Sequence, residues 1–167
     1  MRMLPPLLAL AALVASLAAP DPAGAAPGAE PAPPGLGSKF PGFVLPDVAG
    51  KLVSLDDFRG KAILLSFWSC HTDTCFSSVR VLEELLEEYS ARGLVAPTVC
   101  SEIPAALEKD GYAGLLKSCS TGQPVLIDSD KALAKRLGVT EFPTTYLIDR
   151  NQAVWQVITG VRPLMGE

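Results

Sequence analysis

The sequence predicts an α/β fold, in which a central mixed, mostly parallel sheet is flanked by helices and preceded by a short N-terminal hairpin. Residues 62–68 (AILLSFW) form a nearly continuous apolar run, which is typical of a strand buried on both faces. Further strand-like segments alternate with helical ones along the chain. Residues 144–149 (TTYLID) and 153–159 flank a short polar turn and predict a terminal hairpin.

The elements in the first half follow from local patterns. Residues 43–47 and 51–55 flank a turn at Ala49-Gly50 and predict a short hairpin. Apolar residues at helical spacing predict a helix over 76–92, and Gly93 ends it.

The second half continues the alternation of strands and helices. Residues 94–100 (LVAPTVC) predict a second strand, in which Pro97 lacks a backbone donor and implies a bulge or a sheet edge. The remaining predictions are a helix over 103–117, a strand over 124–128 and a helix over 130–137 that ends at Gly138.

The N-terminal region predicts an exported protein. After the basic Arg2, residues 4–19 are apolar, and this run is shorter than the roughly 20 residues that a membrane-spanning helix needs. Ala23-Gly24-Ala25 offers a cleavage site for a secretory signal peptide, and the alternative is an uncleaved N-terminal anchor. We therefore expect a secreted or periplasmic protein that touches a membrane only through this segment, if at all.

The composition sets the domain organisation. We expect a signal peptide or anchor over 1–25, a linker rich in Pro, Ala and Gly over 26–38, and one folded domain over 39–167. The formal net charge of −4 and the lack of a basic cluster give no support for nucleic-acid binding.

Two motifs in the folded part resemble a known family. Gly60-Lys61 precedes the strand that ends in Phe67-Trp68, and Phe142-Pro143-Thr144-Thr145 precedes the strand that ends in Ile148-Asp149. Over about residues 40–160, the chain resembles the TlpA/ResA branch of the thioredoxin-like, or redoxin, superfamily. The resemblance implies a thioredoxin-like fold, a cis proline at Pro143 beside redox cysteines, and thiol–disulfide exchange with other extracytoplasmic proteins without a cofactor.

The active-site loop departs from the family pattern F-W-A-T-W-C-x-x-C. The chain reads FWSCHTDTC over 67–75, so Thr72 replaces the first cysteine and Cys75 takes the place of the second. The first cysteine of such a motif is normally the thiolate that a helix N-terminus stabilises. The usual C-x-x-C exchange is therefore excluded, and Cys70 is a cysteine that the family does not have.

The first hypothesis is a displaced redox pair, with Cys70 and Cys75 as catalytic residues. Two cysteines are able to form a disulfide when their Cα atoms lie about 4.4–6.8 Å apart. A protonated His71 would favour a thiolate. Supporting roles fall to Thr72 in the loop and to the residues expected around it, which are Trp68, Pro143 and Thr144.

Two other hypotheses stay open. Thr72 and Cys75 fit the T-x-x-C of peroxiredoxins, although Pro143 stands where those enzymes carry an arginine. The third hypothesis is a non-catalytic or Cu(I)-binding domain with Cys70, His71 and Cys75 as weak candidate ligands. His71 is the only histidine in the chain, so a second, distant histidine ligand is not available, and we expect no metal.

A further cysteine is expected near the loop. If strands 62–68 and 94–100 are parallel neighbours, Cys70 and Cys100 lie at the same edge of the sheet, which makes Cys100 an additional redox partner. Cys119 follows the predicted helix over 103–117 and should lie toward the opposite end, which disfavours a Cys100–Cys119 disulfide. The sequence leaves the disulfide connectivity open.

Family members usually continue past the last hairpin into a helix that covers one sheet face. Residues 161–167 (VRPLMGE) are too few for that helix. We therefore expect either that a partner or the N-terminal segment covers this face, or that the sequence is truncated.

Overall fold

The computed structural model describes residues 33–69, 73–102 and 122–160 of the chain. In the described segments no helix is both long and apolar enough to cross a membrane. The elements in chain order are β1 (Val44–Pro46), β2 (Leu52–Ser54), η1 (Leu55–Phe58), β3 (Ala62–Ser69), α1 (Asp73–Tyr89), η2 (Ser90–Arg92), β4 (Leu94–Val95), β5 (Thr98–Glu102), β6 (Val125–Ile127), α4 (Ala132–Arg136), β7 (Thr144–Ile148) and β8 (Val154–Thr159).

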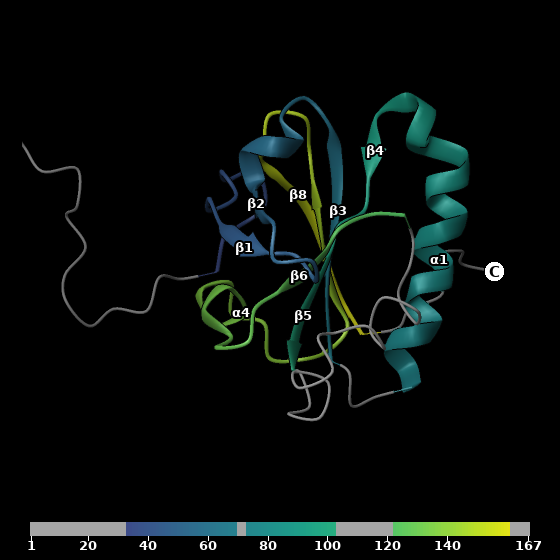
Figure 1. Ribbon diagram of the computed structural model, residues 1–167. Coiled ribbons are helices and arrows are strands. Elements are labelled where there is room, and N and C mark those ends of the chain that lie inside the picture. The colour runs from purple at the N-terminus through teal and green to yellow at the C-terminus, as the bar shows by residue number, and fades with distance from the viewer. Residues whose placement is uncertain (1–32, 70–72, 103–121, 161–167) are drawn as a thin grey trace, which may run out of the picture. The chain divides into compact units, whose positions relative to one another are not determined.

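The strands form a mixed sheet in the order β6-β5-β3-β7-β8, with β4 paired to β3 (Figure 1). Strand β3 pairs in parallel with β4 and β5, and β5 pairs in parallel with β6. The terminal hairpin adds β7 and β8 antiparallel to this core. Strands β1 and β2 form a separate antiparallel hairpin. The predicted thioredoxin-like fold class, with its mixed sheet and N-terminal hairpin, is confirmed.

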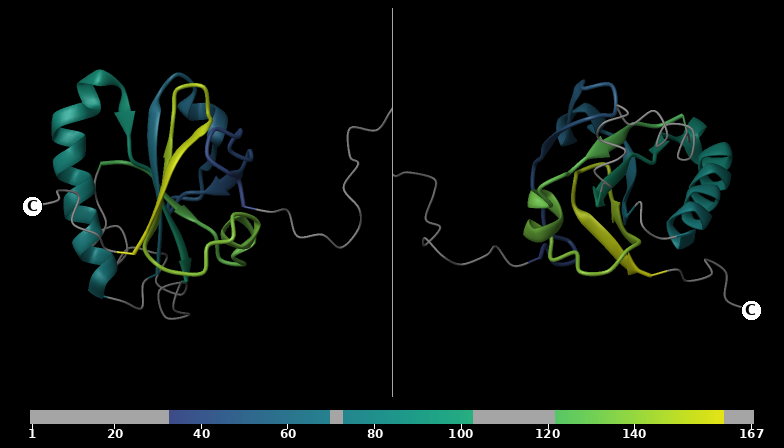
Figure 2. Two further views of the ribbon diagram at one scale, coloured as in Figure 1. Left: turned by 180° about the vertical axis from the view of Figure 1, so that it is seen from behind. Right: turned by 60° about the horizontal axis from the view of Figure 1, so that its bottom comes forward.

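One face of the sheet carries the larger part of the core. Leu65 and Phe67 of β3 point to this face, where Tyr146 of β7 pairs with Leu65. The N-terminal segment supplies Phe40, whose ring lies 5.4 Å from the ring of Tyr146 in an edge-to-face arrangement. Helix α4 and the hairpin β1-β2 lie on this side, opposite α1, in all views (Figures 1 and 2). Because side chains alternate along β3, Leu65 and Phe67 face α4 and the hairpin β1-β2, and the residues that alternate with them face α1.

Helix α1 covers part of the opposite face. Leu82 and Leu86 lie four residues apart on one side of the helix and pack on Leu64 of β3 and Ala96. Gly93 ends this helical region with a φ of 89°, a left-handed conformation that glycine adopts without a steric penalty. The predicted helix and its terminating glycine are confirmed. The predicted helix over 103–117 lies outside the described residues.

Pro97 produces neither the bulge nor the sheet edge that the sequence suggests. It divides the predicted strand into β4 and β5, and β5 lies inside the sheet between β3 and β6. The register on β3 is the same on both sides of the break, with Ile63 opposite Val95 and Ser66 opposite Thr98. The missing N–H therefore interrupts the hydrogen bonding without shifting the strand.

Segments that precede β3 run along both edges of the sheet. Gly37 donates a backbone hydrogen bond to Val154 of β8 (2.7 Å), and Val154 donates one to Ser38 (2.9 Å). At the other edge, Val48 donates to Val125 of β6 (3.1 Å). These bonds leave less unpaired backbone at the two edge strands, where sheets are prone to aggregate.

Candidate functional site

The ends of β3 and β5 meet at the position where the sequence places its reactive loop. Trp68 of β3 is in register with Cys100 of β5, and the register shifts by one residue immediately afterwards. Both side chains are buried, and Cys100 has no exposed surface. The prediction that these two strands are parallel neighbours is therefore confirmed. Cys100 lies opposite Trp68, which is two residues before the start of the loop at position 70.

The loop before β7 lies on the other side of β3. Thr144 pairs with Phe67, so the preceding Pro143 lies at the end of β3 from which the chain enters the 70–72 loop. The Phe142–Pro143 peptide bond is cis, as the family resemblance implies, and Pro143 is buried. The Thr144 hydroxyl donates to the Glu141 carbonyl (2.7 Å), which fixes the turn around the proline.

Helix α1 begins at Asp73, so Cys75 belongs to its first turn. The unpaired N–H groups and the dipole of a helix N-terminus stabilise a thiolate in this turn. Cys70, His71 and Thr72 lie outside the described residues, and their predicted roles stay predictions. The structure thus brings together Trp68, Pro143, Thr144 and Cys100 around the point where the loop leaves β3 and returns as α1.

A buried carboxylate lies close to Cys100 but serves another purpose. The Asp128 backbone N–H donates to the Cys100 carbonyl (3.0 Å). Its side-chain oxygens accept hydrogen bonds from Leu133 (3.1 Å) and Ala134 (2.9 Å) in the first turn of α4. Asp128 therefore caps α4, a role that was not predicted from the sequence. An aspartate between an apolar strand and a predicted helix was the signal that marks such a cap.

The described residues contain no group of three or more His, Cys, Asp and Glu side chains that could hold a metal ion. Two of the candidate copper ligands, Cys70 and His71, are not among these residues. The copper hypothesis is therefore not tested by the structure.

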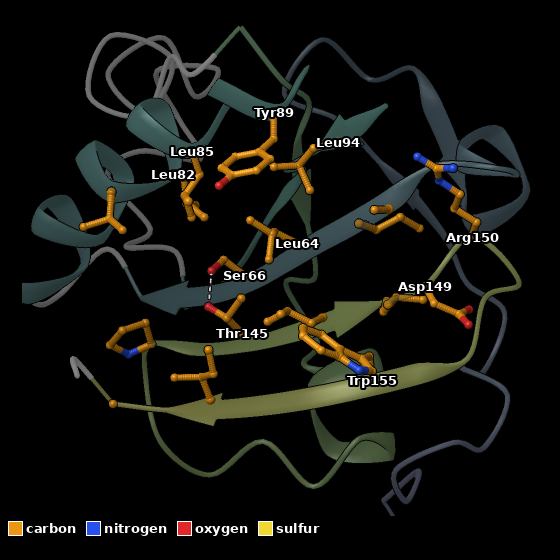
Figure 3. A pocket seen from close by; sticks show the side chains of 18 residues that line it. Leu64, Ser66, Leu82, Leu85, Tyr89, Leu94, Thr145, Asp149, Arg150 and Trp155 are labelled. Atoms are coloured by element: carbon orange, nitrogen blue, oxygen red, sulfur yellow. Dashed lines mark hydrogen bonds between the residues drawn. The ribbon is translucent and has the colours of Figure 1, made fainter. Parts of the chain in front are cut away.

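A large apolar groove of about 780 Å³ lies beside the site on the α1 face of the sheet (Figure 3). Strands β3, β7 and β8 form its floor and α1 forms one wall. Pro143 lines the groove, which therefore extends to the loop beside the candidate site. The hydroxyls of Ser66 and Thr145 are hydrogen-bonded to each other on the floor. These two residues were not singled out from the sequence.

Comparison with known proteins places the chain in a family. The model of the AhpC/TSA family matches residues 36–157. The thiol-disulfide oxidoreductase ResA of Bacillus thuringiensis subsp. konkukian is 31% identical over 126 residues, which cover 75% of this chain and 70% of that protein. ResA of Geobacillus thermodenitrificans is 33% identical over 125 residues, with the same two coverages of 75% and 70%.

A solved structure agrees with these relatives. The putative thiol:disulfide interchange protein DsbE of Chlorobium tepidum superposes with a TM-score of 0.68 at 28% identity, covering 78% of this chain and 89% of that one. The shared fold, the cis proline and the helix start after β3 agree with the sequence similarity. The chain belongs to the AhpC/TSA family and, within it, to the thioredoxin-like thiol-disulfide oxidoreductases of the TlpA/ResA type.

Proposed function

We propose that the chain is an exported thiol-disulfide oxidoreductase that exchanges disulfides with other extracytoplasmic proteins through Cys70 and Cys75. The observation that carries the proposal is the arrangement around the loop. Pro143 flanks the end of β3, and α1 starts three residues after the loop begins, with Cys75 in its first turn. The chain has this arrangement of Pro143, the end of β3 and the start of α1, although Thr72 replaces the usual nucleophilic cysteine.

The chemistry is a two-electron exchange. The thiolate of one cysteine, Cys75 or Cys70, attacks a disulfide of the partner protein and forms a mixed disulfide, and the second partner sulfur leaves as a thiolate. The other cysteine then attacks the mixed disulfide. This step releases the partner as a dithiol and leaves a Cys70–Cys75 disulfide, so the partner is reduced and the enzyme is oxidised. The reverse sequence oxidises a partner dithiol.

Backbone placement supports Cys100 as an alternative second cysteine. Ala96 packs against α1, and alternation along the strand places Cys100 on the same face of the sheet. Position 75 lies in the first turn of α1, the helix that covers this face of the sheet. In this version a Cys75–Cys100 disulfide closes the cycle and Cys70 is dispensable.

The experiment is alkylation and mass spectrometry across a series of glutathione buffers, with the variants Cys70→Ser, Cys75→Ser and Cys100→Ser. We expect a disulfide with a two-electron midpoint that Cys75→Ser abolishes. If Cys70→Ser removes it and Cys100→Ser does not, Cys70 is the second cysteine. The opposite result identifies Cys100. If all thiols stay reduced in oxidising buffer, the proposal is wrong.

Two further measurements address the other hypotheses. Conversion of Cys75 alone to a sulfenic acid by dilute peroxide would favour a peroxidase. Binding of Cu(I) that Cys70→Ser abolishes would favour a copper-binding domain. The export proposal is checked by fractionation and by the N-terminal sequence of the mature protein, which we expect to begin after Ala25 if the signal is cleaved.

A further inference from the structure

Strand β5 is irregular immediately after Cys100. Trp68 of β3 is opposite Cys100, but Ser69 is opposite Glu102, so β5 holds one residue more than β3 over this step. The extra residue is Ser101, and the arrangement is that of a β-bulge. Bulges are over-represented beside active sites, where they change the direction in which side chains point. This bulge lies beside the last residue of β3, where the chain enters the candidate redox loop.

Ser101 is a polar residue in a fully buried place. The residue has no exposed surface, and the preceding Cys100 is equally buried. A buried hydroxyl without a hydrogen-bond partner is costly. The Ser101 hydroxyl donates to Oδ2 of Asp128 (3.4 Å), and Asp128 is itself only 1% exposed. The side chain of the bulged residue is therefore anchored to a buried carboxylate.

Asp128 contacts both residues at the bulge. The last paired residues of β5 and β6 are Cys100 and Ile127. One position further on, Asp128 donates its backbone N–H to the Cys100 carbonyl (3.0 Å) and accepts the hydrogen bond from the Ser101 hydroxyl. One residue thus holds the two sides of the peptide that joins Cys100 to Ser101.

Helix α4 holds Asp128 in turn. The same carboxylate accepts hydrogen bonds from the backbone N–H groups of Leu133 (3.1 Å) and Ala134 (2.9 Å). The end of β5 is therefore fastened, through Asp128, to the first turn of a helix. Because Cys100 has no exposed surface, its thiol reaches a dissolved reagent only when this strand end opens.

We propose that Ser101 and Asp128 are positioning residues that keep the end of β5 closed over Cys100 and thereby reserve its thiol for exchange with the other cysteines of the chain. The inference rests on the proposed function, in the version in which Cys100 closes the cycle. Without the Ser101–Asp128 hydrogen bond, the strand end opens more often. The Cys100 thiolate then attacks an external disulfide, binds one of its sulfurs and releases the other as a thiolate.

The direct test is Ser101→Ala in the full chain. This variant removes the hydroxyl and leaves the hydrogen bonds between Asp128 and α4 in place. We expect alkylation of Cys100 by iodoacetamide in native buffer to become about fivefold faster, which is the effect of one lost hydrogen bond on the opening equilibrium. Low concentrations of urea should leave this rate nearly unchanged, because the opening is local. Mass spectrometry with peptide mapping measures the rate.

The second readout is the product that Cys100 forms with glutathione disulfide. In the parent chain, we expect Cys100 in a disulfide with Cys75 and little glutathione adduct. Ser101→Ala should raise the ratio of the Cys100–glutathione adduct to that disulfide by about the same factor of five. This ratio reports where the thiol reacts, and a uniform loss of stability does not predict the change.

Ser66→Ala is the matched control. It also removes a buried serine hydroxyl, from the neighbouring strand β3, but the partner of that hydroxyl is Thr145. The control should change neither the alkylation rate nor the adduct ratio at Cys100.

A second variant tests whether Ser101 acts through Asp128. Asp128→Ala should accelerate Cys100 alkylation at least as much as Ser101→Ala does. In the double variant, Ser101→Ala should add little, because the acceptor of its hydrogen bond is already gone.

Three results would overturn the proposal. The first is an unchanged Cys100 rate in Ser101→Ala, and the second is an equal acceleration in Ser66→Ala. The third is that Cys100 forms no disulfide with Cys75 or Cys70 in the parent chain. In that case a Cys70–Cys75 disulfide would leave the proposed function standing, whereas thiols that all stay reduced would reject the function as well.

Discussion

Gly160 and Pro143 are joined by a backbone hydrogen bond of 2.8 Å, in which the Gly160 N–H donates to the Pro143 carbonyl. This bond ties the end of β8 to the loop that flanks the candidate redox site. The same two residues line one end of the apolar groove. The groove and the site therefore share a boundary at these two residues.

Gly160→Ala should destabilise the protein by about 1 kcal/mol, because a Cβ is disfavoured at a φ of 76°. The built Cβ meets no described atom within 4 Å, so the cost is conformational rather than steric. Urea denaturation measures the difference. Gly42→Ala is the control, because Gly42 has no such φ and its Cβ is equally unobstructed. Equal costs for the two variants would contradict the prediction.

Ser66→Ala and Thr145→Val should each cost about 1 kcal/mol, because each variant leaves the other hydroxyl without its partner on an apolar floor. The double variant should cost less than the sum of the two single variants. A double-mutant cycle by chemical denaturation gives the coupling free energy. Strict additivity would show that the hydrogen bond makes no contribution.

Asp128→Ala should be the most destabilising carboxylate substitution among the described residues, at about 2 kcal/mol. It removes two hydrogen bonds to the first turn of α4 and leaves the buried N–H groups of Leu133 and Ala134 unpaired. Asp130→Ala is the control, since Asp130 is exposed and its carboxylate accepts from the Ala132 N–H, while the bond from Lys135 goes to its backbone carbonyl and is unaffected. A similar loss for both variants in thermal denaturation would argue against the buried cap.

The acid stability of the terminal hairpin should depend on Asp149. The N–H of Ala153 donates to this carboxylate, and that hydrogen bond, helped by Asn151, lowers the pKa of Asp149. A lowered pKa in the folded state stabilises the protein fully above the unfolded value of about 3.9. The contribution is lost as the pH falls through 3.9 toward the folded pKa.

Asp149→Asn should therefore be less stable than the parent near neutral pH, and the gap should narrow as the pH falls below about 4. Thermal melts between pH 7 and about pH 3 provide the comparison. Because the main cause is a hydrogen bond, the narrowing should persist in about 1 M salt, where long-range charge effects are screened. A gap that stays constant with pH would contradict the assignment.

Cys100 should react very slowly with iodoacetamide in the reduced, folded protein, because its side chain has no exposed surface. Unfolding in urea should raise its rate of alkylation by orders of magnitude, to that of an ordinary thiol. Mass spectrometry with peptide mapping measures the rate at each cysteine separately. Rapid labelling of Cys100 under native conditions would show that the end of β5 opens readily.

Much of the fold follows from local signals in the sequence. The apolar run that forms β3, the amphipathic spacing of α1 and the glycine that ends it specify their elements directly. The effect of Pro97 was harder to predict. A strand residue without an N–H causes a bulge, lies at a sheet edge or interrupts the strand, and the neighbouring strands decide which of these three occurs. Here the register on β3 is held on both sides of the break, so the strand divides and does not bulge.

The site was only partly predictable. Trp68, Cys100 and Pro143 converge because parallel pairing and the β3–β7 register bring them together. The sequence indicated the parallel pairing, whereas the place of Pro143 was implied only by the family resemblance. The role of Asp128 depends on its hydrogen bonds to the helix that follows it. The Ser66–Thr145 hydrogen bond depends on the pairing of two strands whose residues are 79 positions apart in the sequence. Pairwise contacts of this kind leave no periodic pattern in either segment.

The stretch before β1 is held in place by residues near the other end of the described domain. The Lys39 ammonium donates to the Asn151 carbonyl (3.0 Å) across 112 positions of sequence, and the Phe40 ring packs on Tyr146 of β7. On a ribosome, these first residues emerge long before the segments that hold them. Contacts between such distant segments slow folding, because the entropy cost of closing a long loop comes before the contacts stabilise the structure. Lys39 and Phe40 therefore reach these native contacts only after β7 and the turn that follows it have been synthesised.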